Sequence, residues 1–133
     1  MRKALLDTNA YTKLLTGEVE VLDIISVVET LYMSIFVLGE LHAGFRGGSR
    51  AKENLDVLQN FLMKPSVKIL NATTETAQIF GVIKSDLGKA GTPLPINDVW
   101  IAAHAVETGS IIISYDRHFN FIPGIRLWDK LKL

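Results

Sequence analysis

The chain has 133 residues, 48% of them hydrophobic, which is enough apolar surface to bury the core of one ordinary domain. Lysine and arginine number 14 and so do aspartate and glutamate, so any contact with nucleic acid has to come from a local basic patch. The lack of cysteine excludes disulfides and thiolate metal sites. No apolar run approaches the roughly 20 residues of a membrane span, and no signal peptide is evident. We expect a single domain over residues 1–133, soluble and cytoplasmic.

A short apolar run at the start of the chain ends abruptly in an acid. Residues 4–6 are too few for a helix and predict a buried strand, with Asp7 as its last residue. Thr8 or Asn9 is a good N-cap for a helix that ends at Gly17. Ligands of open α/β sheets bind beyond the carboxyl ends of the strands, and Asp7 is expected at such an end.

The rest of the chain alternates between helical and strand-like patterns. Helical spacing of apolar residues predicts helices at 18–29, 35–46, 49–62, 73–87 and 98–108, the last one capped by Asn97. Short β-prone runs predict strands at 30–34, 67–70, 111–113 and 125–127. Alternating strands and helices favour an α/β fold, a three-layer sandwich with a mostly parallel sheet of about five short strands flanked by helices.

Three further acids fall at related places in this pattern. Glu40 lies among the apolar residues of the helix predicted at 35–46, Asp98 in the first turn of the last helix, and Asp116 just past the strand at 111–113. Each acid alone has an ordinary explanation as a cap, a turn residue or a surface charge. Together with Asp7, however, all of them can reach one edge of the sheet, where they would repel unless a cation held them.

Carboxylates gathered in this way indicate a hard divalent cation. Mg²⁺ typically takes one or two protein carboxylates, with waters and substrate phosphates completing its shell, and phosphoryl transfer is the chemistry that uses such a site. Arg46, Arg50 and Lys52 are the compact basic group nearest to Glu40 in the sequence, and they are candidates for holding a phosphate backbone. The histidines at 42, 104 and 118 lack zinc-site spacing and are expected to be packing or surface residues.

Four motifs follow one another along the chain: D-T-N at 7–9, E-L-x-x-G at 40–44, N-D-x-x-I-A-A at 97–103 and S-x-D-x-x-F at 114–119. In this order and at these separations they resemble the PIN-domain ribonucleases, in particular the VapC-type toxins of toxin-antitoxin pairs. The resemblance spans essentially the whole chain. It implies a PIN-like fold and a metal-dependent endoribonuclease that hydrolyses RNA phosphodiester bonds.

The resemblance also implies roles for particular residues. Four acids would be catalytic, three of them would hold Mg²⁺ or Mn²⁺, and the pocket would be supported by neighbouring hydroxyl and amide groups. The catalytic set is Asp7, Glu40, Asp98 and Asp116; the metal set is Asp7, Asp98 and Asp116, with Asp7 and Asp98 the principal ligands; the supporting set is Thr8, Asn9 and Ser114.

The partners implied by the resemblance are an RNA substrate, a second copy in a homodimer, and an antitoxin with a DNA-binding N-terminal part. The wide apolar faces of residues 18–29 and 35–63 exceed what a small sheet needs to cover, which fits a groove for a partner helix.

Other functions stay open from the sequence alone. The chain could be a PIN-fold RNA-processing nuclease without an antitoxin, or a non-catalytic PIN-fold binding or scaffold protein. A haloacid-dehalogenase phosphatase needs a second aspartate two residues after the first, where this chain has Asn9, and a phospho-acceptor receiver domain needs an acid pair near the first strand, where only Asp7 stands.

Overall fold

The computed structural model describes residues 2–128, which form four strands, six α-helices and one 3-10 helix. The strands are β1 (Lys3–Leu6), β2 (Thr30–Ser34), β3 (Val67–Leu70) and β4 (Ile111–Ile113). The helices are α1 (Thr8–Leu15), α2 (Val19–Val27), α3 (Ile35–Arg46), α4 (Ala51–Leu62), α5 (Thr74–Ala90) and α6 (Ile96–Thr108), and η1 (Arg117–Phe121) is the 3-10 helix. No helix among residues 2–128 has the length and apolar character needed to cross a membrane.

The four strands form one parallel sheet in the order β3-β2-β1-β4. The register pairs Leu5 with Tyr32 on one side of β1 and Leu6 with Ile113 on the other. Ala4, Leu5 and Leu6 of β1 are fully buried, as expected for the central strand of a sheet covered on both faces. Because all strands are parallel, their carboxyl ends lie along the same edge of the sheet.

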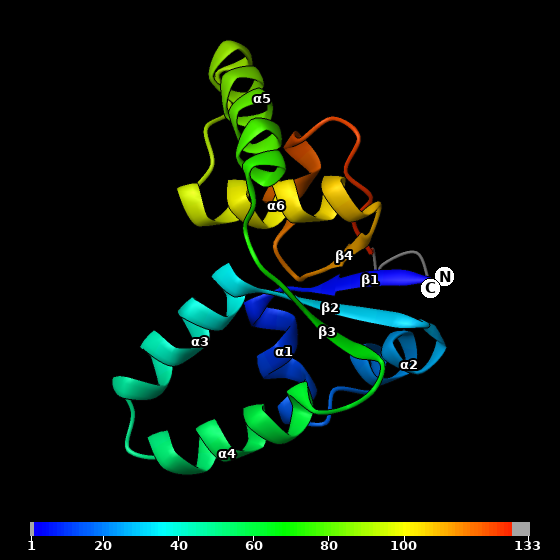
Figure 1. The fold of residues 1–133 in the computed structure, drawn as a ribbon, viewed down its shortest axis with the longest axis vertical. Coiled ribbons are helices and arrows are strands. Elements are labelled where there is room, and N and C mark those ends of the chain that lie inside the picture. The colour runs from blue at the N-terminus through cyan, green and yellow to red at the C-terminus, as the bar shows by residue number, and fades with distance from the viewer. Residues whose placement is uncertain (1, 129–133) are drawn as a thin grey trace.

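Helices cover both faces of the sheet and make the predicted three layers (Figure 1). α5 and α6 lie on one side, whereas α1 to α4 lie on the other. α1, α3 and α6 begin at the carboxyl edge of the strands. Three rings connect layers near that edge: Phe36 of α3 stacks on Trp100 of α6 with centroids 5.0 Å apart, and Trp100 stacks on Phe80 of α5 at 3.9 Å. This aromatic column fixes α3 relative to α6.

The structure departs from the sequence-based predictions mainly at element ends. The fifth strand expected at 125–127 is reduced to a single bridge between Ile112 and Leu127, so the sheet has four strands. The N-caps of α1 and α6 are Asp7 and Pro95, not Thr8 or Asn9 and not Asn97, because both helices begin one or two residues earlier than predicted.

One buried polar network joins α6 to the strand side of the molecule. The Nε2 atom of His104 lies 3.2 Å from the carbonyl oxygen of Asn71, and since a carbonyl only accepts, Nε2 carries the hydrogen. Nδ1 therefore accepts from the hydroxyl of Ser34 at 2.8 Å, and the same oxygen accepts the Phe36 N–H as the N-cap of α3. Burial lowers the pKa of His104, which keeps the imidazole neutral.

His104→Ala should destabilise the fold by about 2–4 kcal/mol, because it removes two buried hydrogen bonds and leaves a cavity. His42→Ala is the matched control, since His42 is exposed and its loss should cost less than about 0.5 kcal/mol. Urea unfolding of both variants measures the difference, and equal losses would contradict a structural role for the buried ring.

Candidate functional site

Asp7 lies at the carboxyl end of the central strand. It directly follows β1, and its backbone N–H donates to the carbonyl of Ile113 at 3.0 Å, which extends the ladder between β1 and β4 by one step. The residue is only 5% exposed, as is Ser114 at the end of β4. The two adjacent strands therefore deliver one carboxylate and one hydroxyl to the same nearly buried place.

Ser114 connects the two strand ends. Its Oγ atom donates to Oδ2 of Asp7 at 2.8 Å and accepts the backbone N–H of Asp116 at 3.0 Å. The side-chain oxygen of Asn9, in the first turn of α1, accepts the backbone N–H of Tyr115 at 3.0 Å. The segment after β4 is thus fastened to the start of α1, and Asp116 is held close to Asp7.

Glu40 reaches the site from α3, where it is half-buried. Oε1 of Glu40 accepts a hydrogen bond from the hydroxyl of Thr8 at 2.6 Å. Thr8 is the residue directly after Asp7, so this bond ties α3 to the same strand end.

Asp98 is in the first turn of α6 and carries the clearest electrostatic signature of the site. Its pKa is raised to about 6, mainly by burial and then by the nearby charges of Asp7, Asp116 and Glu40, in that order, whereas His118 opposes the shift. All four predicted acids therefore act on one another. The structure brings them together from β1, α3, α6 and the segment after β4.

The pKa of Asp7 is also raised. Burial is the largest cause, and the charges of Glu40 and Asp116 add to it. The hydrogen bonds that Asp7 accepts from Ser114 and from the Thr8 backbone work in the opposite direction, because they stabilise the ionised form. The site thus concentrates negative charge that the protein's own donors only partly balance.

His118 is a member of the site that sequence reasoning missed, since the three histidines were interpreted as packing or surface residues. Its Nδ1 lies 2.8 Å from Oδ1 of Asp116, and its backbone N–H donates to the same oxygen at 2.9 Å. A carboxylate only accepts, so Nδ1 carries a hydrogen. The signal that could have revealed this contact is the D-x-H spacing in a turn, where an aspartate side chain commonly accepts from the backbone two residues on.

The donor set suits a hard divalent cation, because it consists of carboxylate oxygens in excess over positive charge. Among residues 2–128, no group of three aspartate, glutamate or histidine side chains converges closely enough to enclose an ion by itself. Such enclosure is typical of calcium or zinc sites, whereas Mg²⁺ usually keeps several waters and takes one or two carboxylates. Asp7 and Asp98 are the two acids whose raised pKa values mark them as least compensated.

The predicted basic group lies farther along the chain from the acids. Arg46 is at the end of α3, six residues or about 9 Å of helix beyond Glu40, and all three basic residues are exposed. Arg50 donates from Nε to Glu53 at 2.9 Å, so part of its charge is already balanced. Arg46 and Lys52 remain candidates for a contact with a phosphate backbone.

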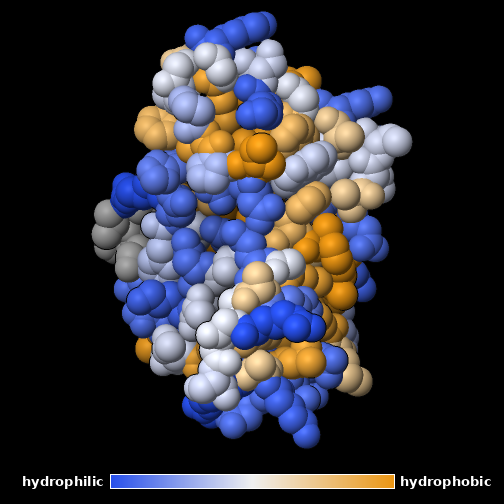
Figure 2. All heavy atoms as spheres, turned by 90° about the vertical axis from the view of Figure 1, so that its left-hand side faces the viewer, coloured by the Kyte–Doolittle hydropathy of each residue, from blue (hydrophilic) through white to orange (hydrophobic). Residues whose placement is uncertain are grey.

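The face on which the strands end is divided by polarity. Figure 2 views the molecule from the side at which α6 begins and shows a hydrophilic area across the middle, with hydrophobic patches above it and to its right. Hydrophilic and apolar surfaces therefore occupy separate regions of this face.

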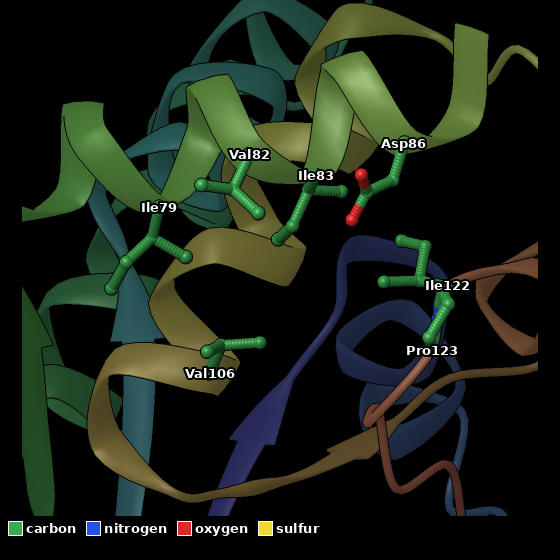
Figure 3. A pocket seen from close by; sticks show the side chains of 7 residues that line it. All are labelled: Ile79, Val82, Ile83, Asp86, Val106, Ile122 and Pro123. Carbon is green, nitrogen blue, oxygen red and sulfur yellow. The ribbon is translucent and has the colours of Figure 1, made fainter. Parts of the chain in front are cut away.

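A separate apolar cavity of about 230 Å³ lies between α5, α6 and the segment after η1 (Figure 3). Ile79, Val82 and Ile83 of α5 point toward Val106 of α6 and toward the segment that carries Ile122. Its lining includes one acid, Asp86, and none of the four site acids. This cavity therefore has no part in the chemistry that the acid cluster supports.

Known proteins resemble this chain in sequence and in fold. The family model described as PIN domain matches residues 4–124. The tRNA(fMet)-specific endonuclease VapC of Salmonella typhimurium is 33% identical over 98 residues, 73% of each chain, and the ribonuclease VapC2 of Haemophilus influenzae is 33% identical over 95 residues, 71% of this chain and 70% of that one. The crystal structure of DNA-bound VapBC from Salmonella typhimurium matches with a TM-score of 0.84 at 29% identity, covering 97% of this chain and 98% of that one.

The matched region contains all four acids and the whole sheet except the first residue of β1. The chain belongs to the PIN-domain family and, within it, to the VapC-type ribonucleases.

Proposed function

We propose that the protein is a metal-dependent endoribonuclease that hydrolyses RNA phosphodiester bonds in the cytoplasm, as the toxin of a VapBC-type pair. The observation that carries the proposal is the gathering of four carboxylates at one sheet edge, where burial and the neighbouring charges together raise the pKa of Asp98 to about 6. A protein that used these acids only as caps or surface charges would gain nothing from burying them together.

Asp7 and Asp98 are the residues that would hold Mg²⁺ or Mn²⁺, with Asp116 beside them. A divalent cation bound there would supply an activated water and stabilise the negative charge that develops on the phosphodiester. Ser114 orients the Asp7 carboxylate through a 2.8 Å hydrogen bond, and Thr8 orients Glu40 through one of 2.6 Å. The hydroxyl groups therefore position acids and need not react themselves.

Glu40 and Asp116 are the two candidates for accepting the proton of the attacking water. Glu40 is half-buried and accepts from Thr8, whereas the side chain of Asp116 is 29% exposed and lies 2.8 Å from the imidazole of His118. The Nδ1 atom that faces Asp116 already carries a hydrogen, so it cannot take a proton from Asp116 through this contact. Both acids therefore remain candidates for the proton acceptor.

The protein also needs a partner that silences it. A groove of about 330 Å³ between α1, α3 and α4 is lined by Tyr11, Leu15, Leu41 and Phe45 and includes Glu40 at one end. Exposed apolar side chains of α2 and the end of α4, such as Leu22 and Met63, extend the apolar surface. An amphipathic helix laid in such a groove is a common mode of recognition, and here it would cover Glu40.

The partner we propose is an antitoxin whose N-terminal part binds DNA, with the toxin itself forming a homodimer. The VapBC structure from Salmonella typhimurium, described as DNA bound, supports this assignment. Sedimentation of the isolated protein measures whether it forms a homodimer, and a monomer at micromolar concentration would reject the homodimer.

Asp98→Asn should reduce RNA cleavage in Mg²⁺ or Mn²⁺ about 100-fold or more while the protein stays folded, because a charge at the site is lost without a change in volume. Asp7→Asn should act in the same way. Asp86→Asn in the α5–α6 cavity is the matched control and should keep full activity. Cleavage rates of a labelled RNA measure all three, and a folded, fully active Asp98→Asn protein would reject the proposal that metal held by Asp98 carries the reaction.

The pKa of Asp98 predicts how stability depends on pH without metal. The folded pKa of about 6 exceeds the value of 3.8 expected for an unperturbed aspartate, so the contribution of Asp98 to stability is fully present below about pH 3.8 and is lost as pH rises through 6. Asp98→Asn should therefore raise the melting temperature at pH 7.5 in chelator, and this gain should shrink toward pH 4.5. The contribution of His104 to stability rises with pH, because its pKa is lowered in the folded state. The contribution of Asp98 is therefore measured as the difference in melting temperature between variant and wild type at each pH.

Mn²⁺ should reverse the destabilisation that the ionised Asp98 causes in the metal-free wild type. At 100 times its dissociation constant it would stabilise the folded state by about 2.7 kcal/mol, and Asp98→Asn should lose most of this shift. Thermal melts with chelator and with Mn²⁺ measure both changes. A variant that melts below the wild type in chelator at pH 7.5, or that shifts equally with Mn²⁺, would show that Asp98 is not part of a repelling, metal-binding group.

Leu15→Glu should weaken binding of the antitoxin about tenfold or more, because it places a charge in the apolar groove, and should leave cleavage by the isolated toxin unchanged. Val82→Glu introduces the same charge at an exposed apolar position on the other side of the sheet and serves as control. Titration of the co-encoded protein into each variant, with RNA cleavage as readout, gives the two affinities; equal inhibition of both variants would move the partner to another surface.

A further inference from the structure

A third hollow lies beside the acid cluster and shares only His118 with the site described above. It has a volume of about 300 Å³ and is lined by Thr92, Pro93, Leu94 and Pro95 of the loop before α6 and by His118 and Phe121 of η1. This size is at the lower end for ligand pockets, so the hollow suits one small, flat group.

Both walls of the hollow continue directly into residues of the acid cluster. The carbonyl of Pro95 accepts the backbone N–H of Asp98 at 3.0 Å, so this wall is joined to the first turn of α6. On the other wall, Nδ1 of His118 lies 2.8 Å from Asp116. A group seated in the hollow would therefore lie next to whatever the acids hold.

The surface of the hollow is aromatic and accessible. Phe121 is 53% exposed, and its ring is nearly parallel to that of His118, with an angle of 18° and centroids 6.3 Å apart. Proteins that bind single-stranded nucleic acid stack unpaired bases on exposed aromatic rings of this kind.

The hollow also offers a polar contact and a rigid wall. The hydroxyl oxygen of Thr92 is buried and has no hydrogen-bond partner among residues 2–128, although buried hydroxyls usually have one. Pro93 and Pro95 restrict the backbone of the loop, so the wall is formed before anything binds and little entropy is lost on binding.

We propose that this hollow takes one unpaired base of the RNA, next to the phosphodiester held at the acids, and so selects where the chain is cut. The inference rests on the proposed nuclease function and adds to it a position at which base identity is read. Sequence-specific reading of RNA usually relies on such unstacked bases in loops and single strands.

Phe121→Ala tests the proposal, with Phe121→Trp as the conservative variant and Val82→Ala as a matched control at another exposed apolar side chain. Short single-stranded oligoribonucleotides with each base varied in turn are cleaved in Mn²⁺, and the product ends are sequenced. Phe121→Ala should raise KM about tenfold, lower kcat much less, and remove the base preference at one position. Phe121→Trp should restore KM and preference, and Val82→Ala should match the wild type.

Binding measured in a cleavage-deficient background separates this inference from the proposed function. Asp98→Asn protein should bind a fluorescent oligoribonucleotide about tenfold more tightly than the Asp98→Asn, Phe121→Ala double variant. A wild type that cuts no RNA would reject the nuclease function, while the binding pair would still decide whether the hollow holds a base. The inference would be overturned if Phe121→Ala kept the wild-type KM and base preference and the two binding variants had equal affinities. It would also be overturned if Phe121→Ala weakened antitoxin binding and left RNA cleavage and binding unchanged.

Discussion

The repulsion among carboxylates at the end of β1 is the constraint on which the rest of the site depends. Asp7 is 5% exposed and lies close enough to Glu40, Asp98 and Asp116 for their negative charges to act on one another. A fold keeps such a group only if its scaffold is rigid enough to prevent the acids from moving apart. The all-parallel sheet supplies that rigidity, since β1 is paired on both sides and covered by helices on both faces.

Three of the four acids are also held by a hydrogen bond from a hydroxyl or a backbone N–H, which does not cancel their charge. Ser114 donates to Asp7, Thr8 donates to Glu40, and the backbone N–H of His118 donates to Asp116. Neutral donors fix direction but leave each carboxylate with its negative charge, whereas a lysine or arginine in the same place would have neutralised it. Further from the site, the His104 network and the aromatic column at Trp100 hold α6 against α3, and this sets the separation of Asp98 from Glu40.

Most of the fold could be predicted because apolar periodicity reflects burial, and burial is strong in this small sheet. The bounds of β2, α3 and β3 coincide with the predicted ranges, and Gly109 ends α6 at a φ of 67°, where glycine has little steric cost. The N-caps of α1 and α6 were wrong because a good capping side chain was taken as the start of each helix. In the structure Asn97 donates to the carbonyl of Phe36 at 3.5 Å, a contact between distant elements that no local pattern reports.

In the site too, features that depend on sequence position were predictable, whereas contacts between distant segments were not. That four acids gather at one edge follows from their positions relative to strand ends, and the structure brings them together. Sequence could not reveal that Asn9 fastens the segment after β4, nor that His118 and the loop at 92–95 enclose a hollow, because these depend on how two loops meet across the sheet edge.

That meeting of two loops has a consequence for specificity. The loop before α6 leads into the helical turn that carries Asp98, and the turn after β4 carries Asp116, so the two segments that line the hollow adjoin two of the four acids. A shift of either loop would move the hollow and the acids together, which keeps the distance between a bound base and the scissile phosphate constant. Cleavage position and base preference are therefore coupled through the backbone, and changes in η1 or in the loop at 92–95 can alter which RNA is cut while the four acids stay the same.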